Sequence, residues 1–75
     1  MFDKNIFAER LRQLRLAHNI TTITLAKELN VSKQAVSQFE KAANYPHCNT
    51  LVALADYFDV SLDYLVGRSD DSTRR

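Results

Sequence analysis

The sequence predicts an all-α fold, a compact domain of five short helices. Apolar residues recur at intervals of three and four along most of the chain, which is the period of an amphipathic helix. One Gly and one Pro among 75 residues argue against an all-β fold, because such a fold needs many turns. Within residues 22–39, two helical segments are separated only by Asn30-Val31-Ser32. Two helices joined by a turn of three to four residues form a helix-turn-helix.

Length and composition indicate one globular domain. A chain of 75 residues is near the smallest size at which a hydrophobic core supports folding without disulfides or metals. Its 45% hydrophobic and 25% charged residues are typical of a soluble protein. We expect residues 1–67 to form the domain, and residues 68–75 to be a disordered polar tail or the start of a linker.

The sequence gives no sign of a membrane segment or a signal peptide. No apolar run approaches the ~20 residues that span a bilayer, and residues 1–8 lack the apolar core of a signal peptide. The single cysteine, Cys48, excludes an internal disulfide framework and suits the reducing cytoplasm. We therefore expect a cytoplasmic protein.

The charges are unevenly distributed along the chain. Residues 1–45 hold seven Lys/Arg and four Asp/Glu, whereas residues 46–75 hold three Lys/Arg and five Asp/Glu. Positive charge thus accompanies the helix-turn-helix, and the acidic half is expected to face away from any phosphate backbone. From charge alone, an ordinary mixed surface is the better interpretation.

The first helix is expected over about residues 6–18. Phe7, Leu11 and Leu14 form its apolar stripe at spacings of four and three, and Asn19 is a suitable C-terminal breaker. Arg10 lies largely off the stripe and is expected on a solvated face.

Polar caps predict the limits of the next two helices. Thr21 is the expected cap of the second helix, which ends near Leu29, where Asn30 tolerates a left-handed conformation. Ala26 is small enough to let two helices cross closely. Ser32 is the expected cap of the third helix, which ends near residue 41 or 42.

Two further helices complete the expected fold. The fourth runs from about residue 48 or 49 to Phe58, and Asn49 is a possible cap because His47 is a poor one. Cys48 is expected to be a small buried thiol. The fifth helix begins after its cap Ser61 and ends at Gly67.

The order and spacing of these residues resemble the lambda-repressor-like family of helix-turn-helix domains, the Cro/CI-type or XRE family. The resemblance covers about residues 6–66. It rests on Ile20-Thr21, Leu25-Ala26-Lys27-Glu28-Leu29, Val31-Ser32, Val36-Ser37, Glu40-Lys41, Pro46, Thr50-Leu51, Leu54-Ala55 and Val60-Ser61-Leu62-Asp63-Tyr64-Leu65. Three residues depart from the family pattern: Thr22 replaces a usual Gln, and Asn30 and Ala42 replace usual glycines.

The third helix carries the candidate base-reading residues. Its outward side chains are Lys33, Gln34, Ser37 and Gln38, and by resemblance these occupy the family's base-reading positions. Gln34 and Gln38 lie one turn apart, and a Gln amide can pair with adenine in the major groove. The alternative is that these are ordinary solvent-facing helix residues.

A second set of residues is expected to bind phosphates of the DNA backbone. The N-terminus of the second helix presents free amides near Thr21 and Thr22, which form an anion site. By resemblance, the loop after the third helix grips the other strand. The expected phosphate-binding residues are Thr21, Thr22, Ser32, Lys41, Asn44 and Tyr45, and the alternative for the loop is a solvated surface.

The remaining polar groups indicate no metal site and no catalytic site. The resemblance implies that Arg15 and Glu40 form a partly buried ion pair between the first and third helices, which specifies packing. His47-Cys48 is the only His/Cys cluster, and its spacing is not that of metal ligands. We expect no cofactor, and no enzyme, because no set of catalytic groups converges.

These observations predict a sequence-specific regulator of transcription, a repressor that binds double-stranded DNA. Because one such domain contacts little DNA, a homodimer is expected, with Tyr64, Leu65 and Val66 of the fifth helix as the suggested contact. The alternative is a helix-turn-helix protein-interaction module, of the antitoxin or scaffold kind. Such a module would need exposed apolar residues where the third helix is polar.

Overall fold

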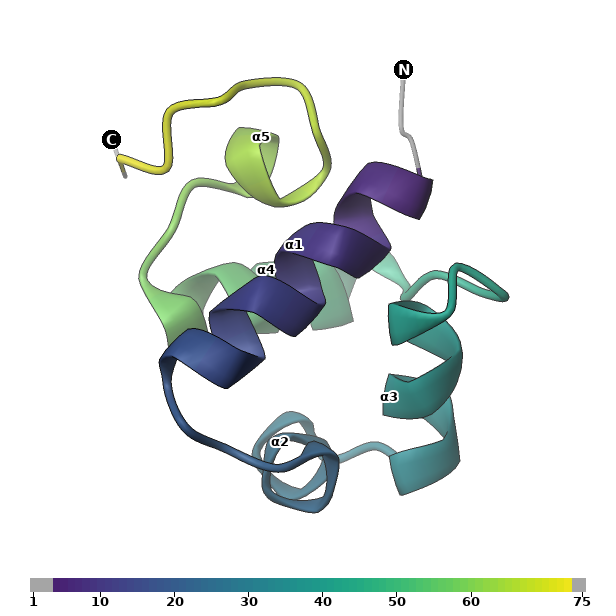
Figure 1. The fold of residues 1–75 in the computed structure, drawn as a ribbon. Helices are drawn as coiled ribbons and strands as arrows, with labels where there is room; N and C mark the ends of the chain where they lie inside the picture. Colours follow the sequence, from purple (N-terminus) through teal and green to yellow (C-terminus); the bar gives the residue numbers. More distant parts are fainter. Residues whose placement is uncertain (1–3, 74–75) are drawn as a thin grey trace.

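A computed structural model describes residues 4–73, which form five α-helices and no strand, as predicted. The helices are α1 Lys4–Ala17, α2 Thr22–Leu29, α3 Lys33–Glu40, α4 Cys48–Phe58 and α5 Leu62–Leu65. Helix α1 crosses the middle of the molecule and contacts α3 on one side and α5 on the other (Figure 1). Helices α2 and α3 pack together as the helix-turn-helix, and α4 packs against α2 and α5. None of these helices is long and apolar enough to cross a bilayer.

Side-chain caps begin three of the helices at the predicted residues. Thr21 Oγ1 accepts a hydrogen bond from the Thr24 amide at 3.1 Å. Ser32 Oγ accepts one from the Ala35 amide at 3.0 Å, and Ser61 Oγ accepts one from the Tyr64 amide at 3.0 Å. Each bond satisfies one of the amides that a helix leaves unpaired in its first turn.

The start of α4 differs from the prediction that Asn49 caps it. His47 occupies the capping position and makes no side-chain cap bond. Asn49 is already the second residue of the helix, so its Oδ1 reaches only the Thr50 amide next to it, at 3.0 Å. Cys48 is exposed. The expectation of a buried thiol is therefore wrong, because this first residue of the helix points away from the core.

Left-handed backbone conformations end the helices. Asn30 has φ 58° and its amide bonds back to carbonyls of α2, while Asp59 has φ 56° and does the same for α4. Ala42 has φ 59°, which a residue with a Cβ adopts at a cost. Gly67 has φ +86°, and a Cβ there would lie 2.9 Å from Ile6 Cγ2, so both its conformation and its contact with α1 require glycine.

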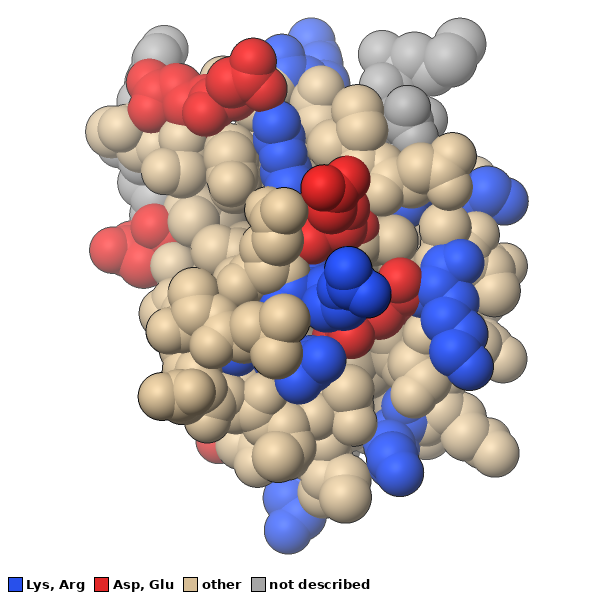
Figure 2. Space-filling model, viewed as in Figure 1, with Lys and Arg blue, Asp and Glu red and all other residues tan. Residues whose placement is uncertain are grey.

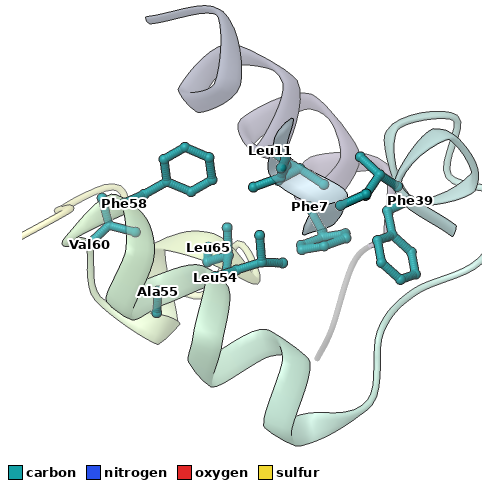
Figure 3. Packing of buried hydrophobic residues seen from close by; sticks show 11 residues of the cluster. Phe7, Leu11, Phe39, Leu54, Ala55, Phe58, Val60 and Leu65 are labelled. Carbon is teal, nitrogen blue, oxygen red and sulfur yellow. The ribbon is translucent and has the colours of Figure 1, made fainter. Parts of the chain in front are cut away.

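The core lies between α1 and the other helices. Phe7 of α1 and Phe39 of α3 meet edge to face, with ring centroids 6.3 Å apart (Figure 3). Ala26 is 4% exposed, consistent with its expected place at a close helix crossing, and Val31 is partly buried against the same core. The core residues are Phe7, Leu11, Leu25, Ala26, Val36, Phe39, Leu54, Ala55, Phe58, Val60 and Leu65.

The end of helix α5 contributes to this core, whereas its first two residues, Leu62 and Asp63, are exposed. Leu65 is 0% exposed and Val66 is 8% exposed. Tyr64 is half-buried, and its ring lies 4.2 Å from the guanidinium carbon of Arg10. The suggestion that Leu65 and Val66 form a dimer contact is therefore wrong, because their side chains are already used inside one chain.

Residues 68–73 fold back over α5 and α1. Arg10 donates hydrogen bonds to the carbonyls of Tyr64 and Ser69, the latter at 2.7 Å, and pairs with the Asp70 carboxylate at 2.7 Å. The Ser61 amide donates to the Ser72 carbonyl at 3.0 Å. Arg10 thus binds the chain itself and is not on a solvated face. The predicted domain boundary at residue 67 stays a prediction, and residues 74–75 lie outside the described part.

Candidate nucleic-acid interface

A polar stripe runs along the outer face of α3 and just past its end. Its members are Lys33, Gln34, Ser37, Gln38 and Lys41, which line one shallow hollow of about 450 Å³. On the opposite face of the same helix, Val36 is 0% exposed and Phe39 is 6% exposed. Because helix positions three and four apart share a face, packing Val36 and Phe39 inward turns the stripe outward.

The side chains of this stripe keep their hydrogen-bonding groups available. Within residues 4–73, no hydrogen bond or ion pair to another protein group is made by the side-chain amides of Gln34 and Gln38. The same is true of the ammonium groups of Lys33 and Lys41. An amide offers both a donor and an acceptor, and an ammonium offers donors only. The stripe therefore presents neutral amides in its middle and positive charge at its ends.

An ion pair between α1 and α3 fixes the orientation of the stripe. Arg15 Nε lies 2.6 Å from Glu40 Oε2, and Arg15 Nη2 lies 3.1 Å from Glu40 Oε1. Arg15 Nη1 also donates to the Ile20 carbonyl at 3.1 Å, so one side chain joins α1, the chain before α2, and α3. The two side chains are only 15% and 9% exposed. Such a two-point contact between planar groups restricts rotation of α3.

The same pair perturbs the Arg15 guanidinium. Its hydrogen bonds to Glu40 raise the pKa of Arg15, burial opposes this by lowering it, and the Glu40 charge raises it further. The arginine is therefore fully charged at physiological pH. The charged groups of both side chains are therefore occupied with each other.

The N-terminus of α2, the first helix of the helix-turn-helix, carries several donors. The amides of Thr22 and Ile23 occupy the first turn, where a helix leaves N–H groups without an intrahelical partner. The Thr21 hydroxyl accepts from the Thr24 amide and donates to Thr24 Oγ1 at 3.1 Å, so it is used for capping. Thr24 is exposed and retains its own hydroxyl hydrogen. Thr24 was not among the predicted phosphate-binding residues, although a third threonine within residues 21–24 was a visible signal.

The loop after α3 presents further polar groups to solvent. Lys41, Asn44 and Tyr45 are exposed, and Tyr45 is 53% exposed. Asn44 Oδ1 accepts the Tyr45 amide at 2.9 Å, which leaves the Asn44 NH₂ group as a donor. Ser32 caps α3 through its oxygen and is also exposed, so its hydroxyl hydrogen remains available. These residues are the expected phosphate-binding candidates at both ends of α3.

The two sides of the molecule differ in charge. Basic side chains lie along the edge formed by α2 and α3, whereas the acidic side chains that gather over α5 and residues 68–73 include Asp70 and Asp63, which are paired with Arg10 and Arg68 (Figure 2). A second hollow of about 450 Å³ between α4, α5 and residues 68–73 is lined by Asp56, Asp63 and Asp71 and by no Lys or Arg. A phosphate backbone would be repelled there, so the α3 side is the one suited to nucleic acid.

The described residues contain no group of three His, Cys, Asp or Glu side chains that could hold a metal ion. His18 is used in an edge contact with the Phe58 ring, with centroids 5.0 Å apart. His47 and Cys48 are both exposed at the start of α4. The α3 surface itself offers hydrogen-bonding groups and positive charge.

Comparison with known proteins decides the family. The helix-turn-helix family model matches residues 11–65, most of the chain. The domain of the P22 c2 repressor, solved in complex with a synthetic operator, superposes with a TM-score of 0.80 at 33% identity, over 85% of this chain and 97% of that one. The chain belongs to the lambda-repressor-like helix-turn-helix family.

Relatives of this helix-turn-helix domain include larger proteins. The HTH-type transcriptional regulator YobD of Bacillus subtilis is 39% identical over 66 residues, which are 88% of this chain and 59% of YobD. The phage CTXphi transcriptional repressor RstR of Vibrio cholerae is 35% identical over 60 residues, 80% of this chain and 54% of RstR. The helix-turn-helix chain described here thus spans little more than half of each of these relatives.

Proposed function

We propose that this chain is a sequence-specific, double-stranded DNA-binding regulator of transcription, a repressor that acts in the cytoplasm. The observation that carries the proposal is the α3 stripe, whose polar groups have no partner within the described residues and stand on a helix fixed by the Arg15–Glu40 pair. The operator-bound structure of the P22 c2 repressor and the names of RstR and YobD support this function.

In this mechanism α3 enters the major groove, which is about 12 Å wide and admits one α-helix. Gln34 and Gln38 then face the base edges, and Ser37 lies between them as a short side chain that permits close approach. Lys33 stands at the start of the helix, where its ammonium reaches a guanine edge or a phosphate. These four side chains are the proposed base-reading set.

Phosphate contacts on either side of α3 would set its register. The amides of Thr22 and Ile23 at the positive end of α2 suit one phosphate, with the Thr24 hydroxyl adjacent. Beyond α3, the ammonium of Lys41, the side-chain amide of Asn44 and the phenol of Tyr45 suit phosphates of the opposite strand. The proposed phosphate-binding residues are Thr21, Thr22, Ser32, Lys41, Asn44 and Tyr45; Thr21 acts mainly by holding the end of α2 in place. Such contacts position the protein without reading sequence.

A binding titration tests the proposal against the protein-interaction alternative. Duplexes selected from a random library are compared with random duplexes by fluorescence anisotropy at several salt concentrations. We expect tight, sequence-dependent binding that weakens steeply with salt, because bound lysines release condensed counterions. Absence of duplex binding at micromolar protein would overturn the proposal and favour a module whose partner is a protein.

We also propose that two copies bind DNA as a two-fold dimer. Two α3 helices must then enter successive major grooves about 34 Å apart, one helical turn. The test is a duplex carrying two selected half-sites at varied spacing, with stoichiometry measured by analytical ultracentrifugation. Insertion of about five base pairs turns one half-site to the opposite side and should abolish cooperative binding. Equal cooperativity at every spacing would contradict the proposal.

Repression itself needs a separate measurement. A reporter gene whose promoter overlaps the selected site should lose expression when the chain is supplied, since a bound protein would block access to the promoter. The Gln34→Ala/Gln38→Ala chain, which keeps the fold but loses base contacts, is the matched control. Increased reporter expression would instead assign an activating role.

A further inference from the structure

The α3 stripe also indicates which bases it reads. We propose that the half-site contains two A·T pairs, within about two base-pair steps of each other, whose adenines are read by Gln34 and Gln38. This inference rests on the proposed function and goes further, because it specifies the DNA sequence class. It follows from the chemistry of the middle of the stripe, from its spacing, and from the groups that are missing there.

The chemistry of the middle of the stripe matches adenine. The side chains of Gln34 and Gln38 each offer one NH₂ group as donor and one carbonyl oxygen as acceptor, and neither side chain has a partner within residues 4–73. In the major groove adenine presents an acceptor at N7 and a donor at N6, which a side-chain amide can satisfy together. Guanine presents two acceptors, N7 and O6, and therefore favours a side chain with two donors.

The charged side chains that would read other bases are placed elsewhere. Helix α3 itself contains no arginine, and Arg10 and Arg15 of α1 are used inside the protein by residues 64–70 and by Glu40. Glu40, the carboxylate on α3 that could accept from cytosine N4, is 9% exposed and held by Arg15. Lys33 and Lys41 stand at the two ends of the stripe, so guanine reading is confined to its ends.

The spacing of the two amides limits the spacing of the two adenines. Gln34 and Gln38 are four residues apart on a regular helix, which corresponds to a rise of about 6 Å. Successive base pairs are about 3.4 Å apart along a strand. The two amides therefore reach base pairs no more than about two steps apart, and Ser37 between them is too short to hold the helix away from the groove.

Base analogues test the inference. A duplex selected by the natural chain is made with each adenine replaced in turn by 7-deazaadenine, which lacks N7, or by purine, which lacks the N6 amino group. We expect two positions at which either analogue weakens binding about threefold or more, because each analogue removes one of the two hydrogen bonds of the contact. Replacement of guanines by 7-deazaguanine in the same region should have a smaller effect.

Variants then assign each adenine to one glutamine. Gln34→Ala should remove the sensitivity to the analogue at one of the two positions, and Gln38→Ala at the other. The reason is that an analogue cannot break a hydrogen bond whose glutamine partner is already absent. Gln13→Ala is the matched control, since Gln13 is an exposed glutamine on α1 whose side chain lies 3.4 Å from Glu9. This control should leave both sensitivities unchanged.

Failure of this inference can be distinguished from failure of the proposed function. Salt-dependent, selective binding to sites that lack the adenine pair overturns the inference and leaves the function standing. Analogue effects that persist unchanged in Gln34→Ala and Gln38→Ala overturn it in the same way. No salt-dependent duplex binding at all overturns both.

Discussion

Ala42 is the residue whose backbone conformation suits its side chain least. Among residues 4–73, four non-glycine residues have positive φ, namely Asn19, Asn30, Ala42 and Asp59. Asn and Asp tolerate this region because a short polar side chain can bond locally, whereas alanine has only the steric cost of its Cβ. The chain accepts that cost at the end of α3, where the Ala43 amide donates back to the Gln38 carbonyl at 3.0 Å.

Replacing Ala42 by glycine should stabilise the protein. The left-handed conformation costs alanine about 1–2 kcal/mol, and glycine avoids this cost. Glycine also has more conformational freedom in the unfolded chain, and this offsets part of the gain in stability. For Ala42→Gly we expect a gain of about 0.5–1 kcal/mol in the free energy of unfolding, measured by urea denaturation. Asn30→Gly, at nearly the same φ, is the control and should change stability by less. A less stable Ala42→Gly protein would contradict this account.

The Arg15–Glu40 pair allows a second prediction at the residue scale. Arg15→Met leaves a carboxylate that is 9% exposed without its partner, and breaking a buried pair in this way costs about 3 kcal/mol or more. The double variant Arg15→Met/Glu40→Leu should recover most of that loss, since it leaves no uncompensated charge. Urea denaturation of both proteins measures the difference. A double variant less stable than the single one would contradict the prediction.

The contribution of Arg15 to the free energy of unfolding should also be independent of pH near neutrality. The pKa of Arg15 is raised in the folded protein above its ordinary value, which is already far above neutral. A raised folded-state pKa gives stability that is fully present below the unfolded pKa and is lost only as pH rises through the folded one. The arginine contribution should therefore be equal at pH 6 and pH 9 when the natural and double-variant proteins are compared.

At the scale of elements, one side chain joins α1, α5 and the C-terminal segment. Arg10 donates to the Tyr64 carbonyl of α5, to the Ser69 carbonyl and to the Asp70 carboxylate, and it stacks on the Tyr64 ring. A helix of four residues, such as α5, is too short to be stable alone. Its position therefore depends on Leu65 in the core and on Arg10 at its end. This arrangement also keeps residues 68–73 on the side of the molecule away from α3.

Loss of Arg10 should loosen α5 and residues 68–73 without affecting DNA binding. Hydrogen bonds from a charged group to carbonyls contribute about 1.5–3 kcal/mol, so Arg10→Met should lower stability by roughly that amount. It should also speed hydrogen exchange of the Ser61 amide, which donates to Ser72. Asp70→Asn is the control: the Asp70 side chain is fully exposed, and such ion pairs contribute little. An equal effect of both changes would contradict the assignment.

The whole molecule separates its charges between two sides. Lys33 and Lys41 stand at the interface, while Asp56, Asp63 and Asp71 line the hollow on the α4–α5 side. With a net charge of only +1, orientation toward DNA depends on this separation rather than on total charge. The dipole of α2 adds positive potential at the same interface.

The salt dependence of binding should report this separation. Removing one phosphate-contacting lysine should lower the slope of log affinity against log salt by about 1, so Lys41→Gln should weaken binding to all duplexes alike. Arg68→Gln removes the same charge from an exposed side chain near Asp63 and should leave the slope unchanged. Fluorescence anisotropy between about 50 and 200 mM salt measures both. Equal changes in slope for the two variants would mean that the salt dependence follows the net charge and not the lysines at the interface.

The sequence by itself determined the helices, the three threonine and serine caps and the inward face of α3, because these depend on periodicity and on neighbours three or four residues away. It also indicated the family, through the order of residues along the helix-turn-helix. Only the tertiary structure decided the roles of Arg10, Cys48, Leu65 and Val66. Their surroundings come from segments far away in the chain, and no local pattern encodes whether such a segment covers a side chain or leaves it exposed.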